Sequence, residues 1–224
     1  MQYTTLTRKE INGKRHYITP FGEFPSVTTI LSATAPADKE ATLEAWRQRV
    51  GVEEAERITQ FSCDAGTVMH ESLEMFNDPT IKHDHSHFGT EEQQLGMKMY
   101  EVMKEKLSKR DIKVIAQEPS LFFKSASGNG YAGSTDLICE YEGELIIADY
   151  KNSRKSKRKE WITDYILQTA AYTLAHNQMY GTQIRSARIW LVTHDLQFQE
   201  FVISPEEMAA AQKEWFARCR EYFN

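Results

Sequence analysis

Two aspartates and one lysine, Asp136, Asp149 and Lys151, lie in the segment 131–153, which is rich in β-branched and aromatic residues. Two carboxylates on facing strands repel each other, and a divalent cation between them removes that cost; hard oxygen ligands suit Mg²⁺ or Mn²⁺. Such an ion can polarise a phosphoryl oxygen and activate water, while a lysine ammonium offsets the charge that develops on phosphorus. The three residues could therefore form a small hydrolytic centre.

A β-hairpin would bring these side chains together. Glu142-Gly143 is a plausible two-residue turn. If Tyr141 then pairs with Glu144, the same register sets the two aspartates directly opposite each other, with Cβ atoms about 4.5–5.5 Å apart. Alternation along the strand places the lysine on that face. A turn one residue longer would put Asp149 opposite Leu137, and an ordinary surface hairpin is the simpler interpretation of any single DxK tripeptide.

The remaining chain predicts one α/β domain over residues 1–224. Its mainly helical N-terminal part covers 1–110, and the catalytic core, a mixed central sheet flanked by helices, covers 111–224. Extended pieces up to Phe24 surround two glycine turns, and a helix begins at Pro25-Ser26. Further helices are expected at 39–50, 52–76, 91–110, 161–180 and from Ser204-Pro205 to the end, and strands at 112–123, 131–141, 145–151, 187–193 and 198–203.

Five motifs occur in one order along the chain: PSVTTIL (25–31), GTVMH (66–70), GSTD (133–136), ADYK (148–151) and QTAAY (168–172). The series resembles that of PD-(D/E)XK nucleases of the RecB type, a group that includes Cas4 proteins. PSVTTIL is most similar to the stand-alone exonucleases of the mitochondrial genome-maintenance and phage type. Each motif is weak alone, but the resemblance spans residues 25–172. It implies the restriction-endonuclease-like PD-(D/E)XK core.

The resemblance also implies a role for each site residue. His70, Asp136, Asp149 and the backbone carbonyl of Tyr150 would be metal ligands, Lys151 the catalytic lysine, and Glu118 a carboxylate that completes the metal site. The ion would be Mg²⁺ or Mn²⁺, and a histidine ligand favours Mn²⁺ more than an all-oxygen site would. Iron–sulfur members of the group use four cysteines, three of them near the C-terminus. Only Cys219 lies there in this chain, so no iron–sulfur cluster is expected.

The helix at 161–180 carries the expected DNA contacts. Gln168 and Tyr172 are one turn apart, and Trp161 and Tyr165 lie along a neighbouring stripe. An aromatic residue on a helix usually belongs to the core. A glutamine beside it favours a polar, substrate-facing stripe instead, where the tyrosine could stack on or hydrogen-bond to a strand.

Phosphate contacts are expected from two further segments. The run KNSRKSKRK (151–159) has six basic residues and no acids in a chain of net charge −5, and it leaves the catalytic strand directly. Arg154 and Lys155 could hold phosphates there by salt-sensitive contacts. Ser26 and Thr28 at a helix start could bind a phosphate, although simple N-capping explains them equally well. The alternating histidines at 83, 85 and 87 could chelate a metal if the loop is extended.

These features together predict a metal-dependent DNA exonuclease that acts on single-stranded ends or flaps in replication, recombination or repair. The alternatives are a non-catalytic, nuclease-like DNA-binding subunit and a DNA endonuclease of the same fold. DNA is the expected partner, with a replication or recombination protein as a further one; the oligomeric state stays open. The chain has no signal-peptide or membrane-span pattern and no paired cysteines, so a cytoplasmic location is expected.

Overall fold

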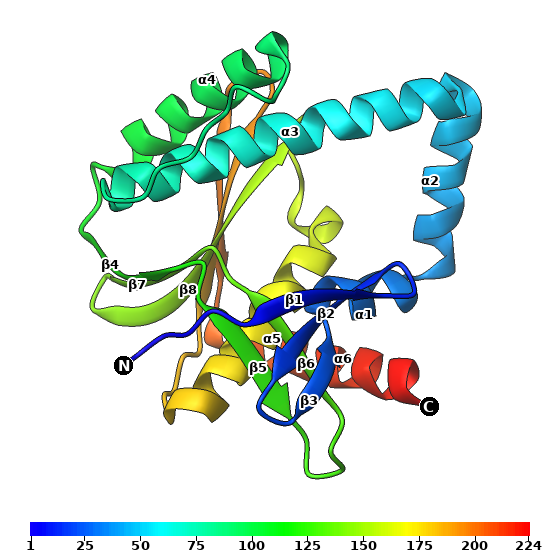
Figure 1. Cartoon of the computed structure of the whole chain (residues 1–224), viewed down its shortest axis with the longest axis vertical. Helices are drawn as coiled ribbons and strands as arrows, with labels where there is room; N and C mark the ends of the chain where they lie inside the picture. Colours follow the sequence, from blue (N-terminus) through cyan, green and yellow to red (C-terminus); the bar gives the residue numbers. More distant parts are fainter.

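Five strands from the second half of the chain form the central sheet of the computed structural model, which describes all 224 residues (Figure 1). Their order is β10-β9-β8-β7-β4, and only the β8–β9 pair is parallel, so the sheet is mixed, as predicted. The strands are β4 (Ile112–Gln117), β7 (Leu137–Tyr141), β8 (Glu144–Ser153), β9 (Ala187–Thr193) and β10 (Phe198–Ile203). Every residue of β9 is buried, because helices cover both faces of the sheet there.

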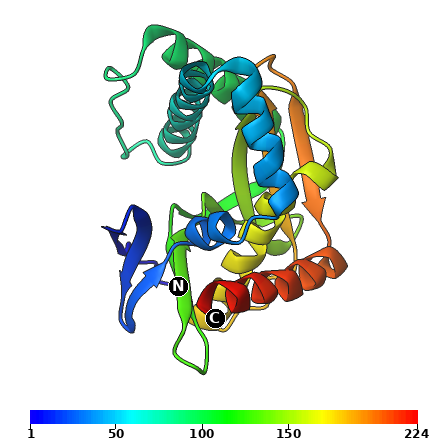
Figure 2. The ribbon, with the colours of Figure 1, turned by 90° about the vertical axis from the view of Figure 1, so that its right-hand side faces the viewer.

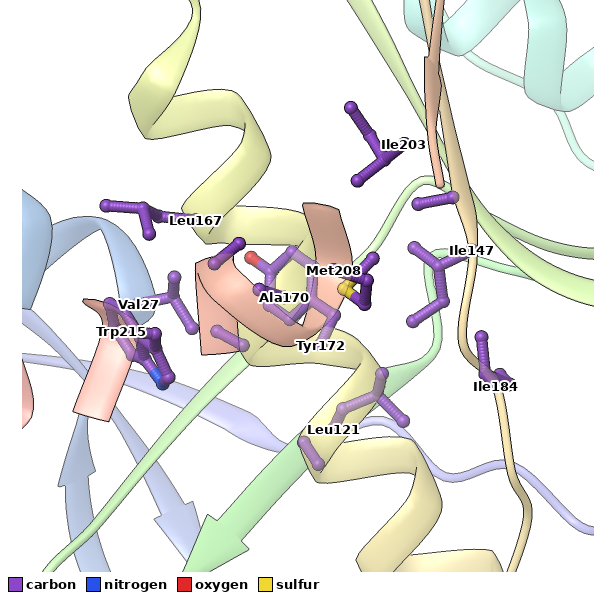
Figure 3. Close-up of a cluster of buried hydrophobic side chains, with 14 of the residues drawn as sticks. Val27, Leu121, Ile147, Leu167, Ala170, Tyr172, Ile184, Ile203, Met208 and Trp215 are labelled. Atoms are coloured by element: carbon purple, nitrogen blue, oxygen red, sulfur yellow. The ribbon is translucent and has the colours of Figure 1, made fainter. Parts of the chain in front are cut away.

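Alternate side chains of β8 enter two different cores. Ile146, Ala148 and Tyr150 join a cluster of 13 buried residues beneath α3 (Val52–Asn77) and α4 (Thr90–Leu107). Ile147 points the other way, into a cluster of 20 buried residues formed with α5 (Thr163–Tyr180) and α6 (Pro205–Phe223) (Figure 3). Ser204 caps α6 through a capping box with Glu207. The central sheet therefore separates two hydrophobic cores, one on each face.

The N-terminal segment forms a separate three-stranded meander of β1 (Thr7–Ile11), β2 (Lys14–Thr19) and β3 (Gly22–Pro25). It lies next to a hairpin of β5 (Ser120–Lys124) and β6 (Gly130–Ser134) (Figure 2). A single parallel bridge joins Ser26 to Ala132. Ser26 caps α1 (Val27–Ala33). The chain then reaches α3 through α2 (Ala37–Val50), a helix with no buried residue that stands away from the sheet (Figure 1).

Two of the predicted strands are wrong as single elements. The segment 112–123 divides at Glu118-Pro119 into β4 and β5, and 131–141 divides at Thr135-Asp136 into β6 and β7. Glu118 has φ +46° and Pro119 has no N–H, so the ladder cannot continue through them. The Glu118 N–H donates to the Asp136 carbonyl at 3.1 Å, so the two breaks lie side by side. The hairpin β5–β6 turns away from the central sheet at this point.

The other predicted elements are confirmed within a few residues at their ends, with a 3₁₀ turn at Lys159–Trp161 preceding α5. No helix combines the length and the apolar character needed to cross a bilayer.

Candidate active site

The open edge of β8 carries the predicted hydrolytic centre. The turn residues Glu142 and Gly143 both have positive φ, 55° and 79°, and Tyr141 pairs with Glu144, so the predicted two-residue turn is confirmed. The ladder with β7 ends at Leu137 opposite Ala148, one pair short of the two aspartates. β8 nevertheless continues to Ser153 against β9. Its last five residues therefore have one backbone edge without a strand partner.

Asp136 satisfies part of that edge. Its Oδ2 accepts a hydrogen bond from the Tyr150 N–H at 2.6 Å. In a β-strand the N–H and C=O of one residue point toward the same neighbour. The carbonyl of Tyr150 therefore faces the same edge, which is consistent with its predicted role as a metal ligand.

Three potential ligands converge at this edge from three elements. One ligand atom from each of His70 on α3, Glu118 in the β4–β5 break and Asp136 before β7 lies within 4.8 Å of the others. His70 Nδ1 is 3.6 Å from Asp136 Oδ2, beyond hydrogen-bond range. The left-handed backbone of Glu118 is a strained conformation of the kind that persists at ligand sites, at a cost of about 1–3 kcal/mol.

Close packing of α3 on β8 places His70. The amide of Asn152 on β8 donates to the Ser62 carbonyl on α3 at 2.8 Å. A Cβ at Gly66 would lie 2.7 Å from the Asn152 side-chain oxygen, so the helix and the strand touch where the glycine is. His70 follows one turn later on the same side of α3. This contact gives a physical reason for the glycine of the GTVMH motif.

Asp149 and Lys151 share the α5 face of β8, as predicted from strand alternation. Asp149 is fully buried, and neither of its oxygens has a well-aligned hydrogen-bond donor; its charged partner is the ammonium of Lys151. That ammonium also lies 5.2 Å from the ring centroid of Tyr165 on α5. No role at the site was predicted for Tyr165 from the sequence. Because it lies three residues from Gln168, and so on the same side of the helix, that spacing could have predicted its position.

The pKa values of the acidic residues differ widely, and two of them, Glu118 and Asp149, are raised so that the site can hold a proton near neutral pH. Burial, and after it the Asp136 carboxylate, raises the pKa of Glu118 to about 8. Burial also raises the pKa of Asp149 to about 6, against the opposing effect of Lys151. For Asp136, burial is outweighed by His70 and Lys151, which lower its pKa to about 2. Burial opposes the charge on His70, but Asp136 outweighs it, and the pKa of His70 is raised.

These residues fit a divalent cation. The Asp149 carboxylate is fully buried with the Lys151 ammonium as its one charged partner and no well-aligned hydrogen bond, and a bound cation would compensate its charge further. One imidazole, several carboxylates and a free backbone carbonyl form a donor set that is mostly hard oxygen, which suits Mg²⁺ or Mn²⁺. His70, Glu118, Asp136, Asp149 and the Tyr150 carbonyl are the groups that would hold it.

The expected DNA contacts on α5 are only partly exposed. Tyr172 is 3% exposed and belongs to the core cluster shown in Figure 3, so the predicted stacking role of its ring is wrong. Its hydroxyl accepts a hydrogen bond from the Gln168 amide at 3.3 Å. A Cβ at Gly133 would lie 2.8 Å from the Tyr172 ring, which explains the glycine of the GSTD motif. Tyr172 therefore orients Gln168, whose contact with DNA stays a prediction.

The other predicted phosphate contacts differ in exposure. Arg154 and Lys155 are exposed directly after β8. Ser26 is 2% exposed and accepts the Thr29 N–H, so its capping role explains it and a direct phosphate contact does not fit. Thr28 is exposed, with its hydroxyl 2.9 Å from that of Ser26.

Comparison with known proteins agrees with this geometry. Residues 43–224 match the PD-(D/E)XK nuclease superfamily. The chain is 27% identical over 208 residues to mitochondrial genome maintenance exonuclease 1 of Mus musculus, covering 88% of this chain and 58% of that protein. It is 30% identical over 183 residues to the protein of the same name from Xenopus tropicalis, covering 78% of this chain and 50% of that protein.

The chain thus spans about half of the length of the curated relatives that it matches. Among solved structures, the protein SSO0001 aligns with a TM-score of 0.40 and 13% identity, over 84% of this chain and 74% of that chain. The family match covers most of the chain, including Asp136, Asp149 and Lys151. The chain therefore belongs to the PD-(D/E)XK nuclease superfamily.

Proposed function

We propose that this protein is a divalent-metal-dependent DNA exonuclease that hydrolyses phosphodiester bonds at single-stranded ends or flaps. The observation that carries the proposal is the group of His70, Glu118 and Asp136 beside the ion pair of Asp149 and Lys151, all at one open strand edge. The preference for DNA ends is supported by the relatives, which are named as exonucleases. Their names also support a role in genome maintenance, through replication, recombination or repair.

A bound Mg²⁺ or Mn²⁺ would polarise a phosphoryl oxygen and lower the pKa of an attacking water. The protein's own residues prepare that chemistry. Asp136 is held by the Tyr150 N–H, and Asp149 is buried, so both carboxylates are fixed before substrate arrives. Burial lowers the pKa of Lys151, but the Asp149 carboxylate outweighs it and the pKa is raised, so the side chain stays an ammonium. That ammonium can orient water and offset charge on phosphorus.

Basic and aromatic side chains in and beyond the segment that leaves β8 support binding of a single strand. Arg154 and Arg57 line a surface hollow of about 290 Å³ together with Phe61, His194 and the acidic Glu91. Further along the chain, Trp161 is 61% exposed and the Arg158 guanidinium lies 5.3 Å from its ring centroid. Cationic groups hold phosphates and a free aromatic face stacks on bases without sequence preference. Trp161 thus replaces Tyr172 as the stacking residue of this proposal.

The test uses linear single-stranded DNA labelled separately at each end, with closed circular single-stranded DNA as a substrate that has no ends. Mg²⁺ or Mn²⁺ is supplied, and Lys151→Ala is compared with Lys113→Ala. Lys113 is also a strand lysine that pairs with a carboxylate, that of Glu140. It is exposed and lies at the start of β4, the end opposite to Glu118. We expect wild type and Lys113→Ala to degrade only the linear DNA, and Lys151→Ala to degrade neither.

Cutting of the circle by the wild type would instead identify an endonuclease of the same fold. Retained DNA binding without cleavage of either substrate would identify a non-catalytic DNA-binding subunit. A linear RNA of the same sequence is the third substrate, and its degradation at the rate of the DNA would remove the assignment of DNA as the specific substrate.

A further inference from the structure

A second group of metal-ligating side chains lies between α3 and the loop that follows it. Glu71 and Glu74 are on α3, and His83 and His85 are on the loop before α4. Their side chains are only 14–27% exposed, so the loop covers this face of the helix. None of the four belongs to the group of His70, Glu118 and Asp136 described above.

His83 is oriented by one glutamate and faces another. Its Nε2 is 3.0 Å from Glu74 Oε2, within hydrogen-bond range. Its Nδ1 faces Glu71 Oε1 at 3.7 Å, which is too long for a hydrogen bond. When Nε2 carries the proton that it donates to Glu74, Nδ1 is a bare acceptor. Two acceptors then face each other with no hydrogen between them, an arrangement that a cation stabilises.

His85 approaches the other oxygen of the same carboxylate. Its Nε2 is 3.1 Å from Glu71 Oε2, yet this buried nitrogen has no well-aligned hydrogen-bond partner. Asp84 between the two histidines takes no part, since its carboxylate accepts from the N–H and hydroxyl of Ser86 and closes the local turn. Glu71 therefore has an imidazole nitrogen beside each of its oxygens.

We propose that Glu71, His83 Nδ1 and His85 Nε2 bind a zinc ion, with Glu74 as the carboxylate that orients His83. Zinc binds imidazole and carboxylate at about 2.0–2.2 Å, so neighbouring ligands of a tetrahedral site lie about 3.3 Å apart. The two imidazole nitrogens lie 3.1 and 3.7 Å from different oxygens of the Glu71 carboxylate, so each nitrogen–oxygen separation by itself is near this value. Histidines that bind metal almost always donate their other N–H to an acceptor such as a carboxylate, as His83 does to Glu74.

Two imidazoles also distinguish this group from the catalytic one, since they favour zinc over Mg²⁺. The three ligands do not yet converge within 4.8 Å as the catalytic group does, so the two rings would close around the ion on binding. Glu71 directly follows His70 in α3. A zinc ion here would pin the loop to the helical turn that presents His70 to the catalytic metal.

The experiment titrates the full-length protein with Zn²⁺ by calorimetry and with Co²⁺ by absorption, which reports tetrahedral coordination. Wild type is compared with His83→Ala, His85→Ala, Glu74→Gln and the catalytic-site variant Asp136→Asn. His87→Ala is the matched control, because His87 is exposed on the same loop and packs against Phe88. Circular dichroism establishes that each variant is folded.

We expect His83→Ala and His85→Ala each to lose one zinc equivalent and the tetrahedral cobalt spectrum. Glu74→Gln should lower the zinc affinity of this site about tenfold. This is the lower limit of the roughly 10–100-fold loss expected when a ligand loses the hydrogen-bond partner that orients it. His87→Ala and Asp136→Asn should keep it. If Asp136→Asn abolishes all zinc binding while His83→Ala and His85→Ala bind as wild type, the histidine–glutamate contacts are ion pairs only. Nuclease activity is not the readout, so neither outcome bears on the proposed function.

Discussion

The two halves of β8 show how one strand serves both stability and chemistry. Residues 144–148 (ELIIA) pair with β7, and β9 joins on the other side from Ile147 onward. Residues 149–153 (DYKNS) pair only with β9. The paired half is mainly apolar, and the open half has acidic, basic and amide side chains beside an unpaired backbone edge. The site therefore forms where the β7–β8 ladder ends, because the backbone N–H and C=O groups beyond it can bind a carboxylate or an ion.

The largest expected effect comes from the lysine of the open half. Lys151→Ala should lower kcat by about 10²–10³-fold, the loss expected when a group aimed at developing charge is removed. Its melting temperature should fall, because the change leaves the buried Asp149 carboxylate without its charged partner, but the variant should stay folded because neither core loses a side chain. Single-turnover kinetics and thermal unfolding measure the two quantities. A variant that unfolds, instead of losing turnover, would contradict the catalytic role.

In the paired half the expected effect is on stability. Ile147 is fully buried against α5 and α6, so Ile147→Ala should lower the free energy of unfolding by about 2–4 kcal/mol. Chemical denaturation measures it. The folded fraction should keep its kcat, since Ile147 lies within the ladder with β7, before the open edge begins. A loss of kcat without a loss of stability would contradict the assignment of residues 144–148 to stability and of residues 149–153 to catalysis.

Asp149 sharpens the comparison, because it is the first residue of the open half. Asp149→Asn should weaken Mn²⁺ binding by more than the roughly 10–100-fold that loss of an outer hydrogen-bond partner costs. The same change leaves the largely buried Lys151 ammonium without its carboxylate, so the melting temperature of the metal-free protein should fall. Calorimetry with Mn²⁺ and thermal unfolding with a chelator test both effects. A higher melting temperature would show that burying the Asp149 carboxylate costs more than its ion pair with Lys151 contributes.

The smallest effect is a pH dependence of metal affinity. The raised pKa values of Asp149, about 6, and Glu118, about 8, mean that the metal-free site holds a proton near neutrality. A cation must displace that proton, so Mn²⁺ affinity should rise between about pH 6 and 8. In Glu118→Gln the upper part of this rise should disappear. A flat profile in the wild type would mean that Glu118 does not contact the ion.

The sequence predicted the hairpin because its register depends on a local two-residue turn. It also predicted that Asp149 and Lys151 share a face, since strand alternation is a local property. The breaks at Glu118 and Asp136 were missed, because strand composition continues through both. Pro119 was the available signal, as a proline interrupts a ladder. The burial of Tyr172 depends on what the fold packs against α5, which no pattern within the helix reveals.

One further consequence concerns α2, the helix without a buried residue. Substitutions at exposed helix positions usually change stability by less than about 0.5 kcal/mol. Changes along Ala37–Val50 should therefore accumulate with little cost to either core. We expect α2 to tolerate such changes better than the partly buried helices α3 and α5. In the laboratory it is the natural place for a fluorescent label that leaves the hydrolytic centre untouched.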